Sequence, residues 1–456
     1  MERRPKRYLR NPYSSQASRS SLRALTIVAV ISVSFCFSLY YHHYNSYPLP
    51  IHSDTINHAI PTISSALPSK ESFISNHDSN KISYLDVPTI AYAVSLTSCE
   101  ETPSLIDGAA VLMHSIHLSS VQNPTSSSKY DYKMYAIVHE SAMVCKPILE
   151  KIGYTVKQVD VPVPVAEIEG DVLRENVHQN GCCGELEFIK LWAYTLVDHP
   201  FVVHLDLDTV VLKPMDELFD AAIIGDTSQL SAVMWSNEHH FLSSSKEKDE
   251  GLSRQAPINA FFTRDYNMRS AGKKPVGVQG GFLVIRPSMQ VFEEFRAIIR
   301  KGDYRKGSGW GGKGYGPFYG SMTFQGIIPY YYDEIHHGTA IELNRCVYNQ
   351  MADNPRDKRT VNNVVSGKCR DGRQDCEDCR ERNIEDIVTA HFTLCQKPWH
   401  CLPHDQDVLQ HRLCRSLFGE WYRIRADLER LNVPDGVVIG EGTFQPDHFR
   451  GFCKSP

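Results

Sequence analysis

The sequence predicts an α/β fold with a mostly parallel sheet, and three observations support this prediction. From residue 89 onward, short apolar runs alternate with segments of helical periodicity, which is the pattern of βαβ units. A run over 201–205 that is apolar except for His204 indicates a central strand that is buried on both faces. Asp206 and Asp208 follow that run directly. In parallel sheets, ligands collect beyond the carboxyl ends of the strands.

The predicted elements follow one another in a regular order. Strands are expected at 90–97, 132–139, 154–159, 201–205, 230–235 and 278–285, and helices at 105–118, 141–152, 185–196, 288–300 and 408–431. The connections between parallel strands should be right-handed, so that helices cover the sheet.

The composition is that of a globular protein, and its net charge argues against nucleic-acid binding. The chain has 456 residues, of which 42% are hydrophobic and 22% charged, as in ordinary globular proteins. Its formal net charge of -5 provides no basic footprint for nucleic acid. We therefore expect no nucleic-acid partner.

The N-terminal segments predict a membrane anchor. Residues 1–23 are rich in Arg and Lys, and 24–41 carry no charge, which is sufficient for a transmembrane signal-anchor helix. No Lys or Arg follows until Lys70, so the positive-inside rule places 1–23 in the cytoplasm and the rest in the lumen. A cleaved signal peptide is the main alternative, although 40–44 form a poor cleavage site. The polar segment 42–88 is expected to be a flexible stem.

Cysteine usage agrees with a lumenal location. Of 13 cysteines, Cys36 lies in the apolar span, and an even number remains for disulfides in an oxidising compartment. Cys376 and Cys379 form a CxxC pair, for which zinc binding is an alternative. The body is expected over 89–400, followed by a helical extension with cysteines over 401–456. No N-glycosylation sequon is present.

Asp206 and Asp208 predict a metal site. Alternate side chains of an extended chain share a face, so both carboxylates point the same way. Burying two ionised carboxylates side by side costs several kcal/mol unless a cation compensates. A divalent metal is the simplest compensation, and a solvated turn is the alternative.

Five segments taken together resemble the motifs of glycosyltransferase family 8, the glycogenin-like enzymes. They occur in the family's order over about residues 90–400: Phe188-Ile189-Lys190-Leu191, Asp206-Leu207-Asp208-Thr209, Val278-Gln279-Gly280-Gly281-Phe282, Phe324-Gln325-Gly326 and His391-Phe392-Thr393-Leu394-Cys395-Gln396-Lys397-Pro398-Trp399. A single DxD is weak evidence, but DxD followed by a distant His-x5-Lys-Pro-Trp is specific.

The resemblance implies a GT-A type nucleotide-diphospho-sugar transferase fold and a type II membrane protein of the Golgi or another secretory compartment. It implies Mn²⁺ or Mg²⁺ bound by Asp206, Asp208 and His391, with Mn²⁺ favoured by the imidazole. A UDP-sugar would be the donor. The nucleotide would contact Leu96, Thr97 and Ser98 together with Lys190, Lys397 and the two aspartates, and the donor sugar would contact Gln279, Gly280, Gly281 and Gln325. Gln325 and Lys190 are the predicted catalytic residues.

The chain departs from the family pattern at one important position. Phe324 stands where an Asp usually precedes the Gln of Asp-Gln-Gly. Family members retain anomeric configuration, so departure and attack on the same face of the sugar would follow. The glycine-rich segment 302–320 is either a flexible loop or a lid whose aromatic rings, including Trp310 and Tyr315, stack on a sugar.

Two other functions are compatible with the sequence. Asp206-Leu207-Asp208-Thr209 also resembles the first motif of haloacid-dehalogenase-type phosphatases, with Asp206 as nucleophile and Asp333-Glu334 as a later acidic pair. Phe324 motivates a third hypothesis, a non-catalytic nucleotide-sugar-binding protein. The transferred sugar and the glycan, glycoprotein or glycolipid acceptor are not specified, and a homodimer is an open option.

Overall fold

The computed structural model describes residues 87–99, 103–234, 257–270, 272–356, 369–373, 376–395, 397–399 and 409–430. The chain divides into two units, 1–79 and 80–456, and the described residues all belong to the second. The predicted cytoplasmic tail, signal-anchor helix and nearly all of the stem lie outside the described residues. In the part that is described, no helix combines the length and apolar character needed to cross a bilayer.

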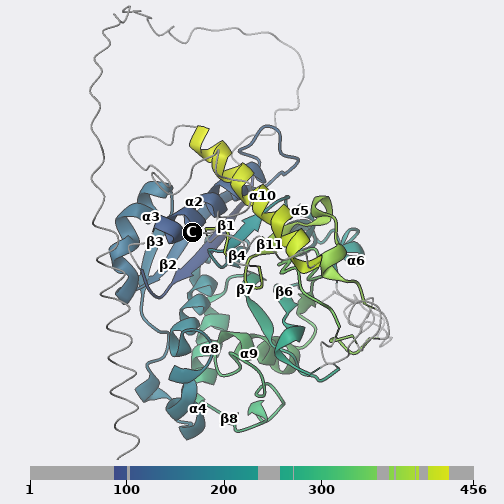
Figure 1. Cartoon of the computed structure of the whole chain (residues 1–456). Coiled ribbons are helices and arrows are strands. Elements are labelled where there is room, and N and C mark those ends of the chain that lie inside the picture. Colours follow the sequence, from purple (N-terminus) through teal and green to yellow (C-terminus); the bar gives the residue numbers. More distant parts are fainter. Residues whose placement is uncertain are drawn as a thin grey trace, which may run out of the picture. The chain divides into compact units, whose positions relative to one another are not determined.

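A mixed, mostly parallel sheet forms the centre of the described unit (Figure 1). Its seven strands, in the spatial order β10-β6-β7-β4-β1-β2-β3, are β10 (Ala340–Glu342), β6 (Ala260–Arg264), β7 (Val278–Ile285), β4 (Val202–Leu205), β1 (Thr89–Leu96), β2 (Asp131–His139) and β3 (Thr155–Val159). Strand β7 alone runs against its neighbours β4 and β6. The predicted α/β class is therefore confirmed.

Helical segments cover both faces of this sheet. They are α2 (Pro103–Leu118), α3 (Lys146–Ile152), the 3₁₀ segment η4 (Gly184–Thr195), α8 (Met289–Lys301), α9 (Phe324–Tyr330) and α10 (Leu409–Arg430). Alternate residues of β1 enter different cores: Tyr92 packs with residues of α2 and α3, and Ala91 packs with residues of η4, α8 and α9. The period-2 geometry of a strand buried on both faces explains this division.

Most predicted elements are present, but the strand expected at 230–235 is wrong. Leu230–Val233 forms a single helical turn, α6, and Met234 makes only an isolated bridge to Leu343. A short apolar run does not by itself distinguish a strand from a buried helical turn.

The glycine-rich segment 302–320 is partly ordered by its own aromatic rings. Two short strands, β8 (Tyr304–Arg305) and β9 (Gly309–Trp310), pair within it. Trp310 and Tyr315 are buried in the core, and the Trp310 indole donates to the Ser321 carbonyl at 2.8 Å. These two rings are therefore unavailable for stacking on a sugar, whereas Tyr319 is about half exposed.

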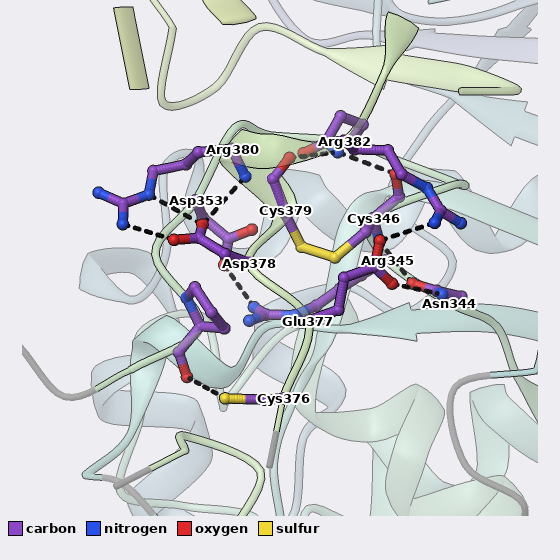
Figure 2. Close-up of a disulfide and its surroundings, with 12 residues drawn as sticks. Asn344, Arg345, Cys346, Asp353, Cys376, Glu377, Asp378, Cys379, Arg380 and Arg382 are labelled. Atoms are coloured by element: carbon purple, nitrogen blue, oxygen red, sulfur yellow. Dashed lines mark hydrogen bonds and ion pairs between the residues drawn. A yellow bond between two sulfur atoms is a disulfide. The ribbon is translucent and has the colours of Figure 1, made fainter. Parts of the chain in front are cut away.

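Four disulfides join eight of the described cysteines: Cys99–Cys145, Cys346–Cys379, Cys369–Cys376 and Cys395–Cys414. The zinc alternative for the CxxC pair is wrong, because Cys376 and Cys379 bond to different partners. Figure 2 shows the Cys346–Cys379 bond beside the ion pair between Asp378 and Arg380.

Helix α10 packs on the same body as the sheet. Its apolar residues share one cluster with Val111 of α2 and with Val210 and Phe392 near the end of the sheet. Cys414 of α10 is covalently joined to Cys395.

Candidate metal and diphosphate site

The aspartate pair lies in a short turn beyond the carboxyl end of β4. The Asp206 amide donates to the Gly281 carbonyl of β7 at 3.2 Å, and the Thr209 amide donates to the Asp206 carbonyl at 3.1 Å. A three-residue strand, β5 (Thr209–Val211), begins directly afterwards. The apolar strand therefore presents both carboxylates at the edge where ligands of parallel sheets bind.

His391 reaches this turn through a second strand pairing. Strand β11 (Thr389–His391) pairs antiparallel with β5, and His391 lies opposite Thr209. Its Nε2 is 3.3 Å from Asp208 Oδ2 and 3.8 Å from Asp206 Oδ2. The pairing of β5 with β11 thus unites residues that are far apart in the sequence.

One imidazole and two carboxylates make a suitable donor set for a divalent cation. The candidate ligand atoms of Asp206, Asp208 and His391 all lie within 4.8 Å of one another. A carboxylate and imidazole set suits Mn²⁺, and carboxylates alone suit Mg²⁺. When bound, such an ion would supply Lewis-acid stabilisation to an anionic leaving group.

Asn349 fixes the orientation of the imidazole. The Asn349 Oδ1 is 3.0 Å from His391 Nδ1, which leaves Nε2 directed at the carboxylates. The Asn349 amide nitrogen in turn donates to Thr263 Oγ1 at 2.9 Å and to Gln279 Oε1 at 3.3 Å. Metal-binding histidines generally have such a partner on the other ring nitrogen, and it sets both tautomer and ring orientation.

The backbone around Asn349 is held by the Cys346–Cys379 disulfide. Gln350 donates to the carbonyls of Cys346 at 2.8 Å and Cys379 at 3.0 Å, and its own carbonyl accepts the His391 amide at 2.9 Å. Asn349 has a φ of 59°, in the left-handed region that Asn tolerates better than most residues. The disulfide in Figure 2 therefore supports the segment that positions His391.

Two lysines flank the carboxylates. Lys190 of η4 donates to Asp206 Oδ1 at 2.9 Å and to the Gly280 carbonyl at 3.0 Å, and Lys397 forms an ion pair with Asp208. Burial alone would lower the pKa of Lys190, but Asp206 and Glu187 raise it above its usual value. Burial would likewise raise the pKa of Asp208, but His391 and Lys397 lower it well below its usual range. Both groups are therefore charged at neutral pH.

The glycines of β7 leave the room that the site requires. A Cβ added to Gly281 would lie 2.3 Å from His391 Cε1 and 2.9 Å from Asp206 Oδ2. A Cβ at Gly280 would lie 3.4 Å from Gln325 Oε1 and 3.5 Å from Lys190 Nζ. The predicted sugar-contact residues Gly280, Gly281 and Gln325 thus adjoin the metal triad and Lys190.

Gln279 and Gln325 have different surroundings. The Gln279 Oε1 accepts from the Gly281 backbone amide at 2.6 Å and from the Asn349 side-chain nitrogen, so Gln279 supports the site from within the structure. Gln325 lies in the first turn of α9 and donates to the Tyr319 carbonyl at 3.2 Å. Its side-chain oxygen faces Gly280.

The predicted uridine-contacting residues lie at the carboxyl end of β1. Strand β1 pairs in parallel with β4, with Ala93 opposite His204, so the two strands end side by side. The Leu96 side chain is buried in the core, Thr97 is half-buried and Ser98 is exposed. The Thr97 carbonyl accepts the Ser141 hydroxyl at 2.7 Å. The Leu96 side chain therefore belongs to the core, whereas Thr97 and Ser98 are at least partly open to solvent.

Phe324 and Glu187 are buried beside Lys190. Phe324 is fully buried, and Lys190 Nζ lies 5.7 Å from its ring centroid, so this side chain packs beneath the lysine. Glu187 is buried, with Oε1 accepting the Cys182 amide at 3.0 Å and Oε2 accepting the Thr323 hydroxyl at 3.0 Å. Glu187, Asn349 and Gln350 were absent from the sequence prediction.

The second acidic pair required by a phosphatase of the haloacid-dehalogenase type is engaged elsewhere. Both Asp333 oxygens accept from Arg264 Nη2 at 2.8 Å, and Glu334 lies 3.5 Å from Lys313 Nζ. Neither carboxylate belongs to the metal-ligand group around Asp206.

No protein-family model and no curated protein matches this sequence. Several solved structures resemble the chain at low identity. The bifunctional glycosyltransferase WbbM in its apo form is 14% identical with a TM-score of 0.36, and the match covers 76% of this chain and 52% of WbbM. This chain thus spans about half the length of WbbM.

Two other structures match over most of their own length. Mouse xyloside xylosyltransferase 1 in its apo form is 12% identical with a TM-score of 0.38, and the match covers 69% of this chain and 100% of that protein. The galactosyltransferase LgtC in complex with donor and acceptor sugar analogs is 12% identical with a TM-score of 0.34, over 73% of this chain and 99% of LgtC. These scores establish neither family nor activity, so the functional assignment depends on the site itself.

Proposed function

We propose that this chain is a metal-dependent glycosyltransferase of the GT-A type that transfers a hexosyl-type sugar from a UDP-sugar. The single observation that supports this best is the union of Asp206, Asp208 and His391 between two lysines, Lys190 and Lys397. Three ligands for a divalent cation beside two cationic side chains match the charge of a nucleoside diphosphate.

Each part of the site has a distinct task in this proposal. Lys190 and Lys397 would bind the diphosphate as point charges, in exchange for part of their present contact with the carboxylates. Mn²⁺, or Mg²⁺, bound to the triad would stabilise the diphosphate as it leaves. Gln325, beside Gly280 and Lys190, would hold the donor sugar by hydrogen bonds. The end of β1, over Leu96, Thr97 and Ser98, would receive the uridine.

We further propose that the reaction retains anomeric configuration by departure and attack on one face of the sugar. Phe324 occupies the position of the family acid, and the Glu187 carboxylate is occupied by two hydrogen-bond donors. Trapping of a covalent glycosyl intermediate on any side chain would contradict this mechanism.

The proposed cellular setting follows from the N-terminal sequence. A basic segment before an uncharged one supports a single-pass type II protein of the Golgi or another secretory compartment, with this body in the lumen. Acceptors would then be glycans, glycoproteins or glycolipids.

The test is a UDP-release screen of the full chain over donor sugars, with and without Mn²⁺. Asp208→Asn should reduce release by at least about 10²-fold. Asp208 is both a proposed metal ligand and the ion-pair partner of Lys397, and the substitution removes its charge. Asp171→Asn is the matched control, since that carboxylate is 76% exposed and pairs with Arg174 on its own helix α4 (Asp171–Asn176). Full release by Asp208→Asn would contradict the metal assignment. Tight UDP and Mn²⁺ binding without release by the wild type would favour a non-catalytic binding protein.

A further inference from the structure

Two neighbouring cysteines at the edge of the site remain outside the disulfides. Within the described residues, Cys182 and Cys183 are the free cysteines, and the other eight are paired. Their sulfur atoms lie 2.7 Å apart. A disulfide bond measures about 2.05 Å, so the two sulfurs would reach bonding distance by moving less than about 1 Å closer to each other.

A glycine-flanked turn holds the two sulfurs together. Gly181 and Gly184 have φ values of 73° and 58°, in the left-handed region, and the Gly184 amide donates to the Asn180 carbonyl at 3.1 Å. A Cβ at Gly184 would lie 2.8 Å from the His178 carbonyl oxygen, so only glycine fits the closed turn.

Buried hydrogen bonds fix this turn to the segment that carries Gln325. The Cys182 amide donates to Glu187, which also accepts the hydroxyl of Thr323. Asn180 Oδ1 accepts the Met322 amide at 2.9 Å. The sulfur pair is therefore held in place by the surrounding fold.

The surroundings favour reaction at one of the two sulfurs. A hydrogen bond from Cys182 lowers the pKa of the Cys183 thiol; burial and the charge of Glu187 oppose this, and the Thr97 side chain and the charge of Lys190 add to the lowering. Cys182 is exposed to solvent, so an oxidant can reach the pair. The thiolate is the nucleophile in thiol–disulfide exchange.

We propose that Cys182 and Cys183 are a redox modification site, a vicinal dithiol that closes reversibly to a disulfide beside the donor site. Adjacent Cα atoms lie about 3.8 Å apart, below the usual disulfide range of about 4.4–6.8 Å. Such a bond is strained, and strained exposed disulfides are reduced more readily than structural ones. The strain of the bond between adjacent cysteines therefore makes its formation reversible.

The co-reactant is a small-molecule disulfide of the glutathione type. The Cys183 thiolate attacks one of its sulfurs, which forms a mixed disulfide and releases one thiolate. The Cys182 sulfur then attacks Cys183, closes the ring and releases the second thiolate. The two protons of Cys182 and Cys183 pass to the two released thiolates, so that two protein thiols are oxidised and one small disulfide is reduced to two thiols.

The experiment uses the full chain and does not depend on sugar transfer. The protein is treated with oxidised glutathione, its remaining thiols are alkylated, and the peptide that contains both cysteines is analysed by mass spectrometry. The expected peptide has lost two hydrogens and carries neither alkyl nor glutathione groups. Reduced glutathione should then restore alkylation of both sulfurs while the four other disulfides stay closed.

Two variants test the order of events. Cys182→Ser should retain glutathione on Cys183, because the resolving sulfur is missing, and Cys183→Ser should react more slowly at Cys182. The proposal is overturned if both wild-type sulfurs remain open to alkylation, if glutathione stays attached to the wild type, or if either sulfur pairs with another cysteine of the chain. A ring that reduced glutathione does not open would also overturn it.

Discussion

The two flanks of the aspartate pair are held in place by different means. On the histidine flank, formed by Asn349, Gln350 and His391, a strand pairing and the Cys346–Cys379 disulfide fix the backbone. On the cysteine flank, which comprises 180–190 and 319–325, apolar packing, hydrogen bonds and ion pairs hold the described residues without a disulfide, and the two thiols are open. A disulfide thus fixes the segment that orients a metal ligand. Noncovalent contacts hold the segment in which Lys190 and Gln325 would meet the donor.

We therefore expect the histidine flank to support metal binding and the cysteine flank to support donor binding. Metal affinity depends on holding the imidazole at one angle, which a cross-linked segment does well. Donor binding requires the lysine to exchange a carboxylate for a phosphate, which a hydrogen-bonded segment permits. Substitutions on the histidine flank should therefore change metal affinity, and substitutions on the cysteine flank should change stability.

The largest effect that tests this comparison is expected at Asn349. Asn349→Gly keeps a residue that tolerates the φ of 59° but removes the partner of His391 Nδ1. We expect Mn²⁺ affinity, measured by calorimetry, to fall by about 10- to 100-fold. Ala352→Gly is the matched control at the other left-handed position of this segment, with a φ of 54°, and should leave affinity unchanged. Wild-type affinity in Asn349→Gly would show that the imidazole does not depend on this contact.

A smaller effect is expected from Glu187→Gln on the cysteine flank. Gln offers one acceptor oxygen where Glu187 offers two, so either the Cys182 amide or the Thr323 hydroxyl loses its partner. The free energy of unfolding in urea should fall by about 1–3 kcal/mol. Glu185→Gln, two residues earlier and less buried, should change it by no more than about 0.5 kcal/mol. Equal effects of the two variants would remove Glu187 from the support of this flank.

A pH-dependent effect is expected at His204, whose ring lies near Phe324 of the cysteine flank. Burial, followed by the charge of Lys190, lowers the pKa of His204 to about 3, while Asp206 opposes the shift. Since the unfolded chain takes up a proton near pH 6.5 and the folded chain does not, stability should fall as pH drops from about 6.5 to about 3, by at most about 1.4 kcal/mol per pH unit.

His204→Gln isolates this contribution from the other titrating groups. Glutamine keeps a polar atom for Ser95, whose Oγ lies 2.8 Å from His204 Nε2. Urea unfolding between pH 4 and pH 8 should show a shallower acid slope for the variant than for the wild type. Parallel slopes would mean that His204 takes up its proton in the folded chain as well.

The fold was predictable where a single apolar run in the sequence forms a single strand. The runs at 90–97, 132–139 and 278–285 became β1, β2 and β7. The antiparallel direction of β7 was not predictable, because apolar periodicity is the same in both directions. Strands β5 and β11 were missed because three residues are too short to show a period, although their pairing brings His391 to the aspartates.

The candidate site was predictable where chemistry requires a residue type. Asp206, Asp208, His391 and the two lysines lie close together in the structure, and their roles toward a metal and a donor stay predictions. Asn349 and Glu187 could not be found in the same way, because their tasks depend on a left-handed backbone and on buried partners supplied by the fold. Their roles for a ligand remain predictions, as do those of Thr97 and Ser98.

Helix α10 has a practical consequence for any shortened form of this protein. Trp399 lies between Gly108 of α2 and Trp421 of α10, and the Tyr422 hydroxyl donates to the Pro398 carbonyl at 2.7 Å. A chain that stopped near residue 400 would leave Trp399 and the lysine two residues before it without this backing. Helix α10 thus supports the segment from which Lys397 would contact a bound phosphate.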